Sequence, residues 1–180
     1  QTVSQNIVHS LANTAAAASV WVTGIYYLGP TTGTNLIARN WVHSLAVSST
    51  TSSSVVNGME LTTGVFTAQN NMVRVGINAS GTTTAAFGTV RGIYDLGVDS
   101  GRNYYHNSVY VGGTQSSGVN NSFAMISTGV SNARTFQNNI FVNGRSNNGA
   151  TGKHYAVQYG GTTVSPTGSV VAVTLLGVPS

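Results

Sequence analysis

The sequence contains no cysteine among its 180 residues, which excludes both a disulfide framework and a thiolate metal site. It also contains no apolar run of the length that a membrane-spanning helix needs, so we expect no membrane span. No cofactor-binding motif and no cluster of metal-ligating residues is evident in it. We therefore expect neither a cofactor nor a metal ion.

Acidic residues are almost as scarce, because the whole chain carries only Glu60, Asp95 and Asp99. Polysaccharide lyases and hydrolases need carboxylates that are grouped for calcium binding or for proton transfer. Asp95 and Asp99 together suggest at most a weak cation site. Acids exposed in a turn, close to Arg91 and Arg102, are the better interpretation of this pair. We expect no catalytic residue and no enzymatic activity.

The seven Lys and Arg residues produce a net charge of +4 only because acids are so few. They are scattered along the chain rather than gathered into a basic stripe, which argues against nucleic acid as a partner. Charged residues make up only 6% of the chain, far below the usual quarter. Low charge, abundant Ser, Thr and Asn, and the lack of cysteine are typical of secreted or cell-surface bacterial proteins, and we expect that location.

What the sequence does contain is a repeat. A short apolar run follows an asparagine five times, at intervals of roughly 31 to 36 residues, a range typical of repeat architectures. The five residues are Asn6, Asn40, Asn71, Asn107 and Asn139. A period held over five copies predicts stacked repeats rather than one irregular globule. We expect residues 1–180 to form a single domain.

Each repeat contains three short strand-like runs, separated by Gly or by clusters of Asn and Ser. The first run begins at the recurring asparagine. The second covers 24–28, 58–61, 92–96, 123–126 and 155–159. The third covers 36–38, 65–68, 103–105 and 134–136, with further copies at 2–4 and 169–175. Runs of this length between turn residues predict strands, not helices.

Alternation along the first run assigns its two faces. The second position after each asparagine is always apolar and should face the core: Val8, Val42, Val73, Val109 and Phe141. The third position is mixed and should face solvent: His9, His43, Arg74, Tyr110 and Val142. The asparagines then point inward at a corner, where stacked amides can satisfy one another. We expect a ladder of the five asparagines.

Two histidines occupy equivalent places on the outer face of the first run. His9 and His43 should stack about 5 Å apart, the spacing of neighbouring strands. A stacked pair of this kind is a possible metal or acid ligand. Arg74 is the next member of the column, and its positive charge argues against a metal there.

The faces of the second run stay open. Either one set points inward, consisting of Tyr26, Glu60, Tyr94, Met125 and Val157, or the other does, consisting of Tyr27, Leu61, Asp95, Ile126 and Gln158. Each set contains an acid. Therefore one acid is buried, or a bulge shifts the phase of the run.

Three parallel runs per coil, an asparagine ladder and turns of variable length predict a right-handed parallel β-helix of about five coils. The segments GIYDLG at 92–97, QNNIFVN at 137–143 and GKHYA at 152–156 resemble the repeats of right-handed parallel β-helix regions in large secreted bacterial surface proteins. Those regions are similar in fold to pectate lyases. The resemblance covers essentially the whole chain, and its motifs are structural, so it implies a fold rather than an activity.

The ends of the chain give the first functional hypothesis, a structural protein. The sequence opens and closes on third-run segments with no polar cap, and the residues concerned are Thr2, Val3, Val170, Val171, Val173 and Leu175. An uncapped coil exposes strand edges to which another coil can add. We expect the chain to be its own partner, in a head-to-tail homopolymer that forms a filament or part of a surface stalk.

Two alternatives remain. A glycan-binding or adhesive module would use outward tyrosines to stack on sugars of a surface glycan, and the candidate contacts are Tyr94, Tyr104 and Tyr105. A polysaccharide lyase is the enzymatic alternative, and it rests on the analogy of fold alone.

Overall fold

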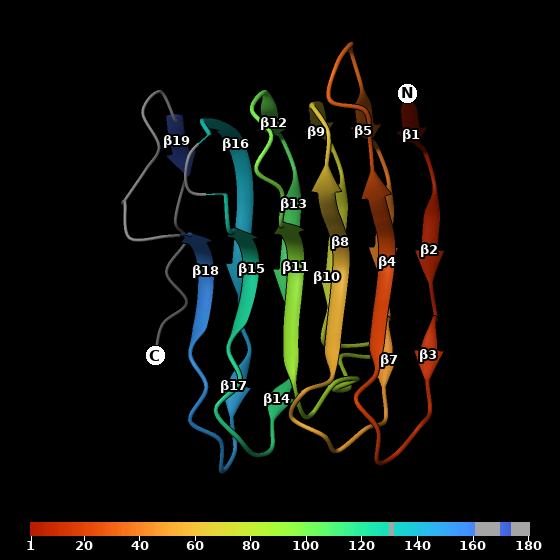
Figure 1. Cartoon of the computed structure of the whole chain (residues 1–180). Helices are drawn as coiled ribbons and strands as arrows, with labels where there is room; N and C mark the ends of the chain where they lie inside the picture. The colour runs from red at the N-terminus through yellow and green to blue at the C-terminus, as the bar shows by residue number, and fades with distance from the viewer. Residues whose placement is uncertain (130–131, 161–169, 174–180) are drawn as a thin grey trace.

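The computed structural model describes residues 1–129 and 132–160, together with the backbone of 170–173. All regular structure in this part of the chain is β, and no helix occurs in it. The strands stack coil upon coil into a parallel β-solenoid of about five turns, which confirms the predicted all-β solenoid. Figure 1 shows the coils side by side, from β1 on the right to β18 and β19 on the left.

Successive coils build three parallel sheets, one from each run of the repeat. Sheet A contains β2 (Ile7–His9), β6 (Trp41–His43), β10 (Met72–Val75), β13 (Ser108–Val111) and the second half of β16 (Arg134–Asn143). Sheet B contains β4 (Trp21–Leu28), β8 (Val55–Thr63), β11 (Thr89–Asp95), β15 (Ser122–Ser127) and β18 (His154–Tyr159). Sheet C contains β1 (Thr2–Ser4), β5 (Leu36–Ala38), β9 (Phe66–Gln69), β12 (Arg102–Tyr105), the first half of β16, and β19 (Val170–Val173).

Smaller elements complete the coils between sheets A and B. Two short parallel pairs lie there, β3 (Ala12–Asn13) with β7 (Ala46–Val47), and β14 (Thr114–Gln115) with β17 (Ser146–Asn147). β16 runs unbroken through the corner between sheets C and A and so joins them. The apolar side chains that point inward from the sheets form one core, with Val42, Met59 and Phe66 among them.

The faces of the second run are decided by the packing of sheet B. In the first three coils Tyr27, Leu61 and Asp95 are buried, and Tyr26 is 56% exposed. The inward set is therefore the one that contains Asp95. Glu60 lies on the outward column between Tyr26 and Tyr94 of the neighbouring strands, and it is nevertheless buried.

The predicted alignment of the last two coils is wrong by one residue. Ser127 and Tyr159, rather than Ile126 and Gln158, continue the inward column of Asp95. A register error of one residue exchanges the two faces of a strand, so it changes every assignment downstream of it.

A missing glycine explains why the sequence does not reveal this one-residue shift. In the first three coils a glycine of sheet B faces sheet A so closely that an added Cβ would overlap a valine: Gly24 meets Val42, Gly58 meets Val73, and Gly92 meets Val109. Ala124 takes this place in the fourth coil, so the glycine that marks the phase is missing from the sequence there. Met125 and Val157 accordingly align with Ile93.

The corner between sheets C and A holds the asparagine ladder. The side-chain Nδ2 and the backbone N–H of each asparagine donate to the Oδ1 of the next one, at 2.9–3.1 Å. The second Nδ2 hydrogen donates to a backbone carbonyl of sheet C, as from Asn71 to Ile37. Asn40, Asn71, Asn107 and Asn139 are buried, and Asn6 is exposed at the end of the ladder.

The residue before each ladder asparagine has a left-handed backbone. Gln5, Arg39, Asn70, His106 and Asn138 have φ values of 54–59°. This conformation costs free energy for residues other than glycine, and least for asparagine. The repeated strain shows that the corner is fixed by the hydrogen bonds of the residue that follows, which outweigh the local preference.

We expect Asn71→Ala to lower the free energy of unfolding by at least about 1–3 kcal/mol, the cost of a buried polar group left without a partner. The substitution removes the acceptor of Asn40 and the donors to Ile37 and Asn107. Urea denaturation followed by circular dichroism measures the loss.

The matched control is Asn6→Ala, which removes an exposed amide that donates only to Asn40 in the ladder. It should cost much less. Equal losses for the two variants would contradict the idea that the interior of the ladder carries the stability of this corner.

Candidate functional site

The buried carboxylate of Asp95 is the centre of an ion cluster at the corner between sheets B and C. One of its oxygens accepts from Arg102 Nη1, and the other accepts from Arg134 Nε at 2.7 Å and Ser127 Oγ at 2.9 Å. Asp95, Arg102 and Arg134 are fully buried. The expectation that Asp95 is an exposed turn acid is therefore wrong, because its strand position points into the core.

Asp99 completes the cluster and makes it neutral. Its Oδ2 accepts from the Gly64 N–H at 2.8 Å and from Arg102 Nη2 at 2.9 Å. The hydrogen bond from Gly64, followed by the interaction with Arg102, lowers the pKa of Asp99 below its ordinary value of 3.8. Arg102, rather than a metal ion, bridges the two carboxylates.

The guanidinium groups of this cluster also hold the turns together. Arg102 donates to the carbonyls of Leu61, Thr62 and Gly64, and Arg134 donates to that of Gly97. Leu61 and Thr62 lie at the end of β8, whereas Gly64 and Gly97 lie in the turns that follow β8 and β11. The cluster therefore joins successive coils.

Glu60, the third acid, is also engaged inside the protein. Its Oε2 accepts from Asn57 Nδ2 at 2.7 Å and from Thr23 Oγ1 at 3.3 Å. Arg91 donates to Asn57 at 3.3 Å, and its guanidinium lies 4.3 Å from the centre of the Tyr94 ring. Burial lowers the pKa of Arg91 below its ordinary value. This chain of contacts runs across three strands of sheet B, β4, β8 and β11, and links their outer faces.

The three tyrosines predicted to contact glycans do not share a surface. Tyr104 is fully buried between Phe66 and Phe136, with ring centres 5.8 and 4.9 Å away, so the prediction is wrong for this residue. Burial, followed by the charge of Asp95, raises the pKa of Tyr104 well above its ordinary value. Tyr94 and Tyr105 are half-buried, but they belong to sheets B and C respectively.

The outer face of sheet A carries a row of exposed apolar side chains. The first position after each ladder asparagine points outward and forms a column in register. Four of its members are large and 41–63% exposed, namely Ile7, Trp41, Met72 and Ile140. Exposed apolar side chains in a continuous row usually mark a contact surface. We call this row the apolar ridge.

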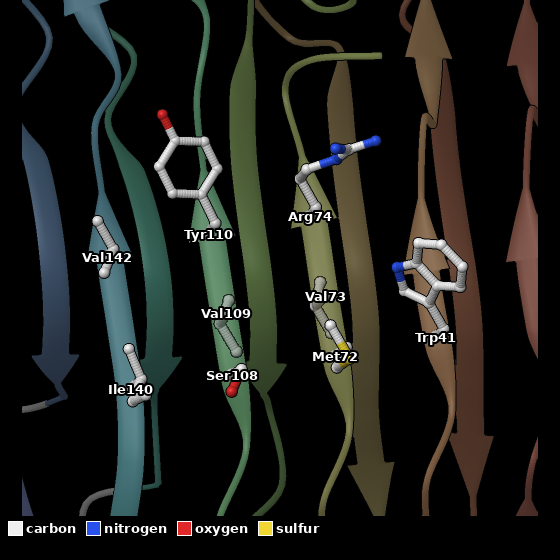
Figure 2. Close-up of a pocket in the computed structure, with 9 residues that line it drawn as sticks. All are labelled: Trp41, Met72, Val73, Arg74, Ser108, Val109, Tyr110, Ile140 and Val142. Atoms are coloured by element: carbon white, nitrogen blue, oxygen red, sulfur yellow. The ribbon is translucent and has the colours of Figure 1, made fainter. Parts of the chain in front are cut away.

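A groove of about 250 Å³ crosses the ridge at the fourth coil. It opens where the small Ser108 lies between Met72 and Ile140, over a floor that includes Val109. In Figure 2, Arg74 extends toward β6, whereas Tyr110 leans toward β16, and the two side chains leave the groove open between them.

The column beside the ridge contains two histidines followed by Arg74, which supplies its positive charge. The rings of His9 and His43 stack with centres 5.1 Å apart and planes 6° apart, which confirms their predicted stacking. Arg74 follows them in register. Among the described residues no carboxylate forms an ion pair with Arg74, and its Nε is buried without a hydrogen-bond partner. No group of three or more potential metal ligands occurs in the described part of the chain.

The residues predicted to mediate self-association lie on terminal strands. Thr2 and Val3 belong to β1, which pairs with β5, and Val170, Val171 and Val173 belong to β19, which pairs with β16. Leu175 lies outside the described residues.

Sequence reasoning missed the ridge and the groove, although a signal for them was present. Strand alternation that places the asparagine and the second position inward also places the first position outward. Trp41, Met72 and Ile140 stand at that position. The partners of Asp95 were harder to predict from the sequence, because Arg134 lies 39 residues further along the chain.

Comparison of the chain with protein-family models, curated proteins and solved structures gives no significant match. The assignment of the fold therefore rests on the structure alone. Within the described residues, no helix is long and apolar enough to cross a membrane.

We expect Asp95→Ala to lower the free energy of unfolding by about 3–5 kcal/mol, the cost of leaving buried charges without their partner. The change removes the carboxylate shared by Arg102 and Arg134. Glu60→Gln is the control, because it removes a buried charge that accepts hydrogen bonds without a close ion pair. Similar losses for both variants, measured in urea, would show that the cluster has no special role.

Stability should also fall as the pH is lowered through 6.5, the ordinary pKa of histidine. Burial, followed by the charges of His9 and Arg74, lowers the pKa of His43, so protonation favours the unfolded chain. Asp99 adds a further loss in stronger acid, because its lowered pKa means that its charged form stabilises the fold.

The urea midpoint at pH 7.5 and pH 5.5 tests the contribution of the histidine column. His43→Gln should reduce the difference between the two values. His106→Asn, at an exposed turn outside the column, should leave it unchanged. An unaltered pH dependence in His43→Gln would rule out the column as its source.

Proposed function

We propose that this protein is a non-enzymatic, structural β-solenoid of the bacterial cell surface or extracellular space, and that it stacks end to end with further copies of itself. The observation that carries the proposal is the open edge of the N-terminal coil. β1, β2, β3 and β4 each pair with a strand on one side only, within the described structure. Unpaired strand edges are templates for the addition of further strands.

Apolar side chains on the same coil support this role. Leu11, Trp21 and Leu28 are 43–62% exposed, and all three lie on the first coil. In sheets A, B and C, the strands of the inner coils pair with a neighbouring coil on both sides. An added coil would bury part of this apolar surface together with the free edge.

The asparagine ladder gives the stack a direction. Each amide donates toward the C-terminal coil and accepts from the N-terminal side. The Oδ1 of Asn6 therefore accepts no hydrogen bond from another ladder asparagine. Only a coil that offers N–H donors at this end can extend the ladder. This polarity favours head-to-tail addition, which propagates as a filament unless its rotation closes a ring.

At the opposite end, β19 occupies the place that β1 of another copy would take. β19 pairs with β16, and Val173 stands opposite Asn139, so a valine follows the last ladder asparagine. A copy whose β1 replaced β19 would instead place Asn6 after Asn139 and continue the ladder. Stacking is therefore in competition with the pairing of β19.

The internal hydrogen bonds of the three carboxylates support a role without catalysis. All three carboxylates of the chain accept hydrogen bonds from the protein itself, and Asp95 and Glu60 are buried. General acid–base chemistry on a glycan needs a carboxyl group that reaches the substrate.

Sedimentation velocity and electron microscopy at rising protein concentration test the proposal. The unmodified chain should form particles whose length increases with concentration. Leu11→Lys combined with Leu28→Lys places charge on the open coil and should keep the protein monomeric. The control is Leu96→Lys combined with Val119→Lys, at exposed apolar positions away from that coil, and it should still assemble.

A second arm removes the residues after Gly160, and β19 with them. Association should become stronger, because β1 of another copy no longer competes with β19 for the edge of β16. A chain that stays monomeric in both forms at every concentration would refute end-to-end stacking.

A further inference from the structure

The outer face of sheet A is a second surface, independent of the ends of the coil. The ridge of Ile7, Trp41, Met72 and Ile140 runs along the solenoid axis, with the groove at Ser108. Its strands are parallel and in register, so this face continues along the solenoid over all five coils. It therefore suits a partner that is itself extended.

The positive charge of this face comes from Arg74, and the described structure places no acid beside it. His9, His43 and Arg74 form a column beside the ridge, and all three acids of the chain lie at sheet B or at the corner between sheets B and C. Arg74 forms no ion pair with any described residue. The face is thus complementary to an anionic partner.

Three other occupants fit less well. A second copy docked face to face would bring Arg74, on the central coil, against its own counterpart, and like charges would repel. An added peptide strand has no free edge at the groove, because β6, β10 and β13 are paired on both sides. A glycan needs many hydrogen-bonding partners, whereas the groove is lined mainly by Met72, valines and Ile140, with Ser108 as its one hydroxyl apart from Tyr110.

We propose that the outer face of sheet A binds the surface of an anionic lipid bilayer. The apolar ridge enters the acyl region, and the groove accepts part of a lipid chain. Arg74 contacts the negatively charged headgroups. Trp41 and Tyr110 have the apolar body and polar tip that suit the boundary between the two regions.

Flotation with vesicles tests this proposal, using phosphatidylcholine vesicles with and without phosphatidylglycerol. The protein should float with the anionic vesicles and much less with the neutral ones. Arg74→Gln should weaken anionic binding about fivefold, the effect of one basic residue near a charged surface. Met72→Ser combined with Ile140→Ser should weaken it at least about tenfold, because two exposed apolar side chains no longer insert.

Tryptophan fluorescence locates the contact, since the chain has only two tryptophans. In Trp21→Phe the remaining Trp41 should shift to the blue on addition of anionic vesicles. In Trp41→Phe the remaining Trp21, which is exposed on sheet B, should not shift.

Three results would overturn the proposal. One is the absence of flotation with either vesicle. Another is a Trp41 shift with a soluble acidic polysaccharide and none with vesicles, which would assign the face to a glycan. The third is concentration-dependent dimerisation abolished by Met72→Ser with Ile140→Ser, which would assign it to a second copy. End-to-end stacking is measured without lipid, so its success or failure leaves this test intact.

Discussion

The corner that holds the asparagine ladder is the constraint on which the rest of the solenoid depends. An inward amide is costly unless both its donors and its acceptor are satisfied. Each inner asparagine meets this requirement only when another lies one coil away, at the correct height and orientation. The ladder therefore fixes the register between coils, and the left-handed residues before it tolerate their strain because this register is fixed.

The buried charged groups, like the buried amides, are stabilised by partners within the protein. Two arginines and two aspartates form a neutral cluster that links turns of successive coils. Because all the acids are used internally, the exposed charge that remains is basic. The outer face of sheet A combines this charge with an apolar ridge, and the open N-terminal coil combines free strand edges with exposed apolar residues. The first surface comes from the outward positions of one strand in every coil. The second comes from the lack of a neighbouring coil beside the first one in the described structure.

Some elements could be read from the sequence alone. The recurring Asn with an apolar residue two places later predicts the first run, its inward face and the stacked His9 and His43, because these depend on local alternation. The second run could not be assigned, because each of its two possible inward sets contains an acid, and only the packing shows that Asp95 is buried beside Arg102 and Arg134. Tyr104 was assigned outward for the same reason: a run of two tyrosines does not show which of them faces the core.

The sequence by itself determined the period, the strand content and the position of the ladder, since each is encoded in residues that recur at equivalent places. Only the tertiary structure decided which polar groups meet. Asp95 and Arg134 belong to different coils, and Met72 and Ile140 adjoin Ser108 only after three coils have stacked. Such contacts depend on the length of every intervening turn. The turns of this solenoid differ in length from coil to coil, so no local sequence pattern predicts which of these side chains meet.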